Sequence, residues 1–188
     1  MRVAATTLAI TLITSFLAPM ARVQHTWFGV ERHQDVDLEI DCFVFQADSN
    51  GHGTASGLSA CAALFDEINH DDSAAYLVIT DDVASEVAWL EATALAVAAL
   101  TVLGSASAVV GYWLPQYGIA PRRLAIQTHA LAAAAGVFAL NSATRFARAI
   151  DRPHDPNGMT HGYVGFGLYV IISMPVIMLA HGSRVKTE

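Results

Sequence analysis

The segment Val36-Asp-Leu-Glu-Ile-Asp-Cys42 alternates strictly between apolar and acidic residues. Because successive side chains of a strand point to opposite faces, this pattern predicts a half-buried strand. Asp37, Glu39 and Asp41 would lie on its polar face, and Cys42 would lie on the buried face. The apolar run then continues to Phe45. We expect this strand to be the centre of a small folded unit.

The residues around this strand extend the same pattern. Glycine and asparagine at 49–53 predict a turn. An apolar piece at 57–65 carries the second cysteine, Cys61, and residues 76–79 resemble a last strand. Trp27 and Phe28 suit either a membrane-surface anchor or the start of a strand. The polar segment 22–86 is therefore expected to contain a small sheet.

Long apolar windows flank this polar segment, one before it and three after it. A membrane-spanning helix needs about 20 mostly apolar residues, and a globular helix rarely lacks charge on every face over such a length. The windows without Asp, Glu, Lys or Arg are 3–21, 92–121, 124–144 and 156–183. The first also fits a cleaved signal peptide, with a short basic start and a small-residue exit. We interpret it as a retained first span.

The expected fold is one all-α membrane domain over residues 1–188, a four-helix bundle with a small extracellular β-sheet in the long first loop. The expected spans cover residues 3–21, 87–113, 123–147 and 161–181, and the extracellular loop covers residues 22–86.

Charge placement predicts which side of the membrane each segment occupies. The net charge is −7, and residues 22–86 hold thirteen acids against Arg22 and Arg32. Such acidity argues against nucleic-acid binding, which needs Lys and Arg to neutralise phosphate. Cytoplasmic segments carry more Lys and Arg. With both termini cytoplasmic, the inner segments would hold Arg2, Arg122, Arg123, Arg184 and Lys186, and the short outer loop Arg145, Arg148 and Arg152.

Cys42 and Cys61 enclose eighteen residues. A disulfide closing such a loop contributes roughly 3 kcal/mol in a chain-entropy estimate. It would require an oxidising compartment, which agrees with an outward loop. We expect the plasma membrane, with an organelle membrane as the alternative. Two free thiols are the alternative. The acidic strand face is either simply solvated or attracts a divalent cation.

Small residues in the apolar windows predict close approach of helices. Gly104 and Ala108 lie one turn apart in the second window, and Ala132 and Gly136 lie in the third. Glycines also mark the expected start of the last helix; these are Gly162 and Gly165.

Several polar residues fall inside the expected spans. Gln127, Asn141 and Arg145 lie near one face of the third helix, a stripe that usually faces other helices and could line a path for an ion. His129 pairs in depth only with His181, because His161 would lie roughly 20 Å away along the bundle. We expect no cofactor. The alternative is a haem group bound by His129 and His181.

No nucleotide-binding loop, zinc-protease motif or nucleophile elbow is present, so an enzyme is not expected. No Asn-x-Ser/Thr sequon is present either. We expect no N-linked glycan on the loop.

In its layout the chain resembles the claudin / peripheral myelin protein / amastin superfamily of four-span membrane proteins. Trp27-Phe-Gly29 stands where claudins have Gly-Leu-Trp before a loop cysteine, and residues 162–169 form a glycine-rich start to the last helix. The chain departs from the family in its wider cysteine spacing. It also has Glu86 and Glu91 where an arginine is expected. The resemblance implies a left-handed four-helix bundle with an extracellular sheet that assembles through lateral or head-on contacts.

The sequence therefore predicts a structural or interaction protein of a membrane, whose partners are lipid and either other membrane proteins or itself. An accessory subunit of a larger membrane complex is the first alternative. A haem- or ion-handling protein is the second.

Overall fold

The computed structural model describes residues 1–27, 36–42, 47–49, 53–55, 81–114, 116, 119–150 and 158–184. Side chains are described at residues 1–22, 85–114, 116, 119–149 and 161–182. Within these ranges the chain forms four helices and five strands.

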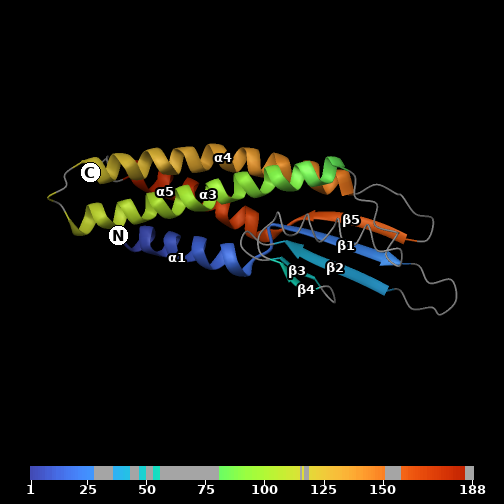
Figure 1. Cartoon of the computed structure of the whole chain (residues 1–188). Helices are drawn as coiled ribbons and strands as arrows, with labels where there is room; N and C mark the ends of the chain where they lie inside the picture. The colour runs from blue at the N-terminus through green and yellow to red at the C-terminus, as the bar shows by residue number, and fades with distance from the viewer. Residues whose placement is uncertain are drawn as a thin grey trace.

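The four helices run side by side along one axis (Figure 1). They are α1 (Arg2–Leu17), α3 (Asp81–Trp113), α4 (Ala120–Ile150) and α5 (Phe166–Arg184). Both α1 and α4 pack against α3 and α5. Residues 85–113 of α3 and 120–149 of α4 are long and apolar enough to cross a membrane, whereas α1 and α5 are shorter apolar helices.

A five-stranded antiparallel sheet lies beyond one end of this bundle (Figure 1). Its strands are β1 (Ala21–Trp27), β2 (Val36–Cys42), β3 (Ala47–Ser49), β4 (Gly53–Ala55) and β5 (Gly158–Val164). The strand order is β4-β3-β2-β1-β5. Strand β1 leads out of α1 and β5 leads into α5, so both segments that join helices at this end contribute to one sheet.

The alternating segment is a strand, as predicted, and it pairs with β1 from Ala21↔Cys42 to Trp27↔Val36. The segment predicted as a turn, 49–53, lies between the paired strands β3 and β4, and its end residues Ser49 and Gly53 pair with each other. Residues 50–52 lie outside the described residues. Residues 57–65 and 76–79 lie outside the described residues.

The helix boundaries at the sheet end differ from the prediction: α3 begins at Asp81 rather than 87, and α4 ends at Ile150 rather than 147. At the other two helices the backbone changes from predicted helix to extended structure. Residues 158–164 form β5, although the sequence predicted that the last helix would begin at 161. An uncharged apolar window does not distinguish helix from strand, and pairing with β1 supplies the backbone partners that fix β5. Helix α1 ends at Leu17, and Ala18 is extended with φ −119° and ψ 129°. Proline at position 19 disfavours helical backbone in the residue before it.

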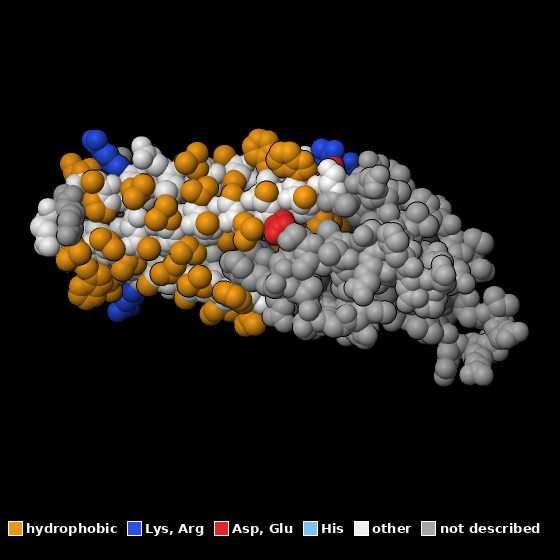
Figure 2. Space-filling view, in the orientation of Figure 1, with side chains coloured by type: hydrophobic (Ala, Val, Ile, Leu, Met, Phe, Trp, Pro, Cys, Tyr) orange, Lys and Arg blue, Asp and Glu red, His pale blue; other side chains and the backbone are white. Residues whose placement is uncertain are grey.

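The bundle interior mixes apolar and polar side chains. Leu90, Phe146, Leu168 and Ile171 are fully buried together with hydroxyl-bearing residues and one histidine. The buried polar residues of the central bundle are Thr7, Thr11, Thr14, Ser15, Thr101, Ser105, Thr128, His129 and Ser142. Many large apolar side chains instead face outward on the helices, where they form the apolar surface in Figure 2. This surface suits an apolar solvent.

Candidate functional site

Among the largest fully buried side chains of the described residues, the polar one is His129 on α4, which is 2% exposed. Its Nδ1 lies 2.5 Å from the carbonyl oxygen of Ala125, one turn earlier on α4. A carbonyl only accepts hydrogen bonds, so Nδ1 carries the proton. In the neutral ring Nε2 then accepts a hydrogen bond from Ser105 of α3, at 3.3 Å. Both ring nitrogens are therefore occupied.

Gly104 allows α3 to approach this histidine. A Cβ atom at Gly104 would lie 2.6 Å from Nδ1 and Cε1 of His129, and 2.5 Å from Oγ1 of Thr128. The Thr128 hydroxyl donates back along α4, 2.9 Å from the carbonyl oxygen of Leu124. Gly104, identified in the sequence as a helix-packing residue, thus holds α3 against a polar layer on α4.

The other sequence-identified small residues occupy different surroundings. Ala132 is fully buried, and a Cβ at Gly136 would come 3.0 Å from Ile172 of α5. Ala108 lines a cavity. Gly162 lies in β5 rather than in a helix, and Gly165 lies at the junction between β5 and α5. The sequence predicted that Gly162 and Gly165 would lie in a helix and pack it against a neighbouring helix. Their positions in the strand and at the junction correct that prediction.

A cavity of about 650 Å³ opens at the end of the bundle opposite the sheet. All four helices line it. Ala4, Ala125 and His129 form buried parts of its wall, whereas Tyr112 and Ile119 are exposed. The cavity therefore runs from an exposed rim to a buried floor at the histidine.

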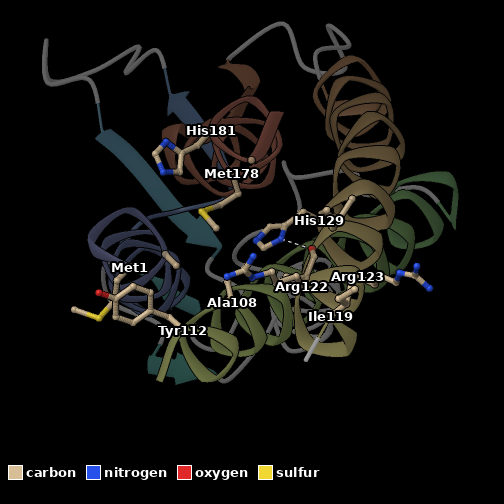
Figure 3. A pocket seen from close by; sticks show the side chains of 13 residues that line it. Met1, Ala108, Tyr112, Ile119, Arg122, Arg123, His129, Met178 and His181 are labelled. Carbon is tan, nitrogen blue, oxygen red and sulfur yellow. Dashed lines mark hydrogen bonds between the residues drawn. The ribbon is translucent and has the colours of Figure 1, made fainter. Parts of the chain in front are cut away.

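Two adjacent arginines at the start of α4 border this cavity (Figure 3). Figure 3 shows the side chain of Arg122 directed between the helices toward the cavity, and that of Arg123 directed away. His181 of α5 stands across the cavity from them. Among the described residues that line the cavity there is no aspartate or glutamate. The mouth is therefore a positively charged rim around an apolar interior.

The geometry bears on the haem alternative. His129 and His181 both line the cavity, which agrees with their expected similar depth. Binding iron through His129 would require one of its two ring hydrogen bonds to break. Within the described ranges no cluster of three or more His, Cys, Asp or Glu side chains is arranged to hold a metal ion.

At the sheet end of the bundle, an ion pair joins α3 to α4. Nη2 of Arg145 lies 2.6 Å from Oε1 of Glu86, and the two side chains are 63% and 11% exposed respectively. The sequence marked Glu86 only as a departure from a family pattern and Arg145 only as part of a polar stripe. Neither the family comparison nor the polar stripe predicted the ion pair between these two residues.

The remaining residues of that stripe face outward. Gln127 and Asn141 are exposed, although the sequence predicted that they would face other helices. The helical period shows which residues of α4 lie on the same face. It does not show whether that face packs against another helix or points outward. The buried polar face of α4 is instead the one that carries Thr128, His129 and Ser142.

The sequence-predicted interaction residues lie in the sheet. Trp27 ends β1, and Asp37, Glu39, Asp41 and Cys42 belong to β2, where only the backbone is described. Phe28 and Cys61 lie outside the described residues. The disulfide between Cys42 and Cys61 therefore stays a prediction.

Sequence reasoning missed two features, one at the cavity and one at the sheet end of the bundle. The arginine pair was used only to orient the chain, although a basic pair directly before an apolar helix could also have indicated an anion site. Gly167 was not singled out, yet a Cβ there would lie 2.7 Å from the carbonyl oxygen of Ala18.

No protein-family model matches this chain, and no curated protein matches it either.

Proposed function

We propose that the protein is a four-span membrane protein with a structural or interaction role, whose sheet makes contacts with other membrane proteins or with a second copy. One observation carries the proposal. A sheet built from both interhelical segments of one end stands beyond a bundle whose outward faces are apolar.

Helix lengths support the membrane placement. At 1.5 Å per residue, the 33 residues of α3 and the 31 residues of α4 extend well beyond the roughly 30 Å of a hydrocarbon core. The 16 residues of α1 and 19 residues of α5 span roughly 24 and 28 Å. The shorter helices continue directly into β1 and β5, so the excess length of α3 and α4 would flank the sheet outside the bilayer.

The proposed orientation puts the sheet on the non-cytoplasmic side. The cavity end holds Arg2, Arg122 and Arg123, which suits the cytoplasmic face. The acidic sheet segment then faces an oxidising compartment, where Cys42 and Cys61 can pair. The antiparallel sheet joined to a four-helix bundle also supports the resemblance to the claudin / peripheral myelin protein / amastin superfamily, which we retain as part of the proposal.

Self-association is the sharpest test. Two differently tagged copies would be produced in one membrane, extracted in a mild detergent and tested for co-purification, which reports lateral contacts. Mixing cells that each make one tagged copy and measuring their adhesion reports head-on contacts. We expect at least one assay to be positive.

Two variants that neutralise carboxylates in different parts of the polar segment locate the contact. Asp37→Asn, Glu39→Gln and Asp41→Asn together neutralise the polar face of β2, whereas Asp71→Asn with Asp72→Asn removes charge elsewhere in the same segment. Loss of association only in the β2 variant supports the proposal. A protein that is monomeric in both assays, and joins no stoichiometric membrane complex, contradicts it. Stable recovery in such a complex without self-association supports the accessory-subunit alternative.

The position of His129 and His181 on one cavity favours a second candidate, a haem-binding protein. The visible absorption spectrum of the gently extracted protein tests it. A Soret band that His181→Ala removes would support haem, and a colourless preparation from cells supplied with haem would contradict it.

A further inference from the structure

We propose that the cavity at the end of the bundle binds one anionic phospholipid of the adjacent leaflet, with its phosphate at Arg122 and an acyl chain inside. The proposal rests on the membrane placement given above but not on the contacts proposed for the sheet.

The shape of the cavity suits an amphiphile. Its volume of about 650 Å³ lies within the roughly 300–1,000 Å³ that is usual for small-molecule sites. Ala4, Ala108 and Ala125 line its interior, and burial of hydrocarbon against such side chains is favourable. The hydrogen bonds of His129 satisfy its ring internally, so the floor requires no polar group from a ligand.

The charge of the rim selects the head group. Arg122 points into the mouth in Figure 3, and the described part of the lining holds no carboxylate that would repel an anion. A guanidinium can bind two phosphate oxygens at once through parallel N–H donors. Basic pockets between membrane helices on the cytoplasmic side are suited to anionic head groups, which are enriched in that leaflet. A zwitterionic lipid brings its own cation and gains less from this rim.

The experiment uses the full chain in a neutral detergent. Phosphatidylglycerol or phosphatidylcholine with identical acyl chains would be added, and both the thermal unfolding midpoint and the lipid retained in native mass spectrometry would be measured. We expect one phosphatidylglycerol per chain to be retained and to raise the midpoint. Phosphatidylcholine is expected to bind at least tenfold more weakly, and inorganic phosphate alone to give no shift.

The two neighbouring arginines provide the decisive comparison. Arg122→Gln is expected to weaken phosphatidylglycerol binding at least tenfold, whereas Arg123→Gln, which removes the same charge one residue away, is expected to change it less than twofold. Equal weakening by both variants would show a nonspecific attraction to anionic lipid and would overturn the proposal. Equal binding of the two lipids to the unaltered protein would overturn it too.

A third variant blocks the mouth without changing charge. A Cβ at Gly182 meets no atom within 4 Å, so Gly182→Phe can be accommodated while it places a ring at the cavity rim. Retention of lipid by this variant would contradict the proposal even if Arg122→Gln failed to fold. Co-purification of tagged copies, measured on the same variants, separates a failure of the lipid site from a failure of the proposed sheet contacts.

Discussion

The two ends of the helical bundle are built in opposite ways. At the sheet end, the junction after α1 and the junction before α5 lie backbone against backbone. The amide of Gly165 donates to the carbonyl of Met20 at 2.9 Å, and that of Gly167 donates to Pro19 at 3.0 Å. Met20 is fully buried there. These contacts hold β1 and β5 in register and leave no room for a side chain.

At the opposite end, the same four helices surround a cavity instead. Its rim residues Tyr112, Ile119 and Arg122 are exposed. Tight backbone contact at one end therefore fixes the arrangement of the helices, and the other end can be hollow without loss of the fold. Among glycines given a Cβ, the greatest loss of stability is therefore expected at the backbone contact of the sheet end, and the least at the open rim of the cavity.

The largest effect is expected for Gly165→Ala. The added Cβ would overlap the carbonyl oxygen of Pro19 and lie 2.5 Å from its carbonyl carbon. Backbone held by hydrogen bonds on both sides cannot move away cheaply, so we expect a loss of about 3 kcal/mol or more. Thermal unfolding in detergent measures it. The control is Gly182→Ala, whose Cβ meets open space. Equal losses of stability in the two variants would contradict the inference that the sheet end is packed more tightly than the cavity end.

The sequence predicted the parts of the fold that depend on local pattern. Alternation predicted β2, and uncharged windows predicted four helices. Glycine and asparagine at 49–53 predicted a turn in the place where β3 and β4 pair, although the two strands themselves were not predicted. It did not predict β5, because residues 158–164 become a strand only through pairing with β1, which is more than 130 residues earlier in the chain. Nor did it predict that Ala21 begins a strand, although Pro19 carried that signal.

A smaller loss is expected for Gly104→Ala, nearer the cavity. The new methyl group would press on His129 and Thr128, which are side chains rather than backbone and can shift at some cost. We expect about 2 kcal/mol, within the usual range for overpacking. Gly136→Ala meets Ile172 only at 3.0 Å and should cost less. Unfolding midpoints of the two variants test this order, and a larger loss at Gly136 would refute the close contact at the histidine.

The ion pair of Glu86 with Arg145 should contribute less again, because Arg145 is largely exposed. Arg145→Gln leaves the carboxylate of Glu86, which is 11% exposed, without this partner, and we expect a loss of about 1 kcal/mol. Arg148→Gln, on the same helix end, is the charge-matched control and should change stability by less. A double-mutant cycle with Glu86→Gln measures the coupling, and a value near zero would exclude a stabilising pair.

The candidate site was less predictable from sequence than the fold. The depth of a residue along a helix follows from counting, so the shared position of His129 and His181 on one cavity could be anticipated. Rotation about the helix axis depends on which neighbours pack there. For this reason Gln127 and Asn141 face outward, contrary to the prediction. The ion pair between Glu86 of α3 and Arg145 of α4 was not predicted for the same reason.

The smallest effects are expected from two hydroxyls one turn apart on α3. Ser105→Ala removes the hydrogen bond to Nε2 of His129 and leaves that nitrogen buried without it, at a cost of about 0.5–1 kcal/mol. Within the described part of the chain, the buried hydroxyl of Thr101 has no hydrogen-bond partner. Thr101→Val keeps the shape and removes a polar atom that bonds nothing, so stability should stay within about 0.5 kcal/mol or rise. Unfolding midpoints of the two variants in the same detergent compare them directly. A greater loss for Thr101→Val than for Ser105→Ala would show that Thr101, rather than the Ser105–His129 contact, joins α3 to its neighbours.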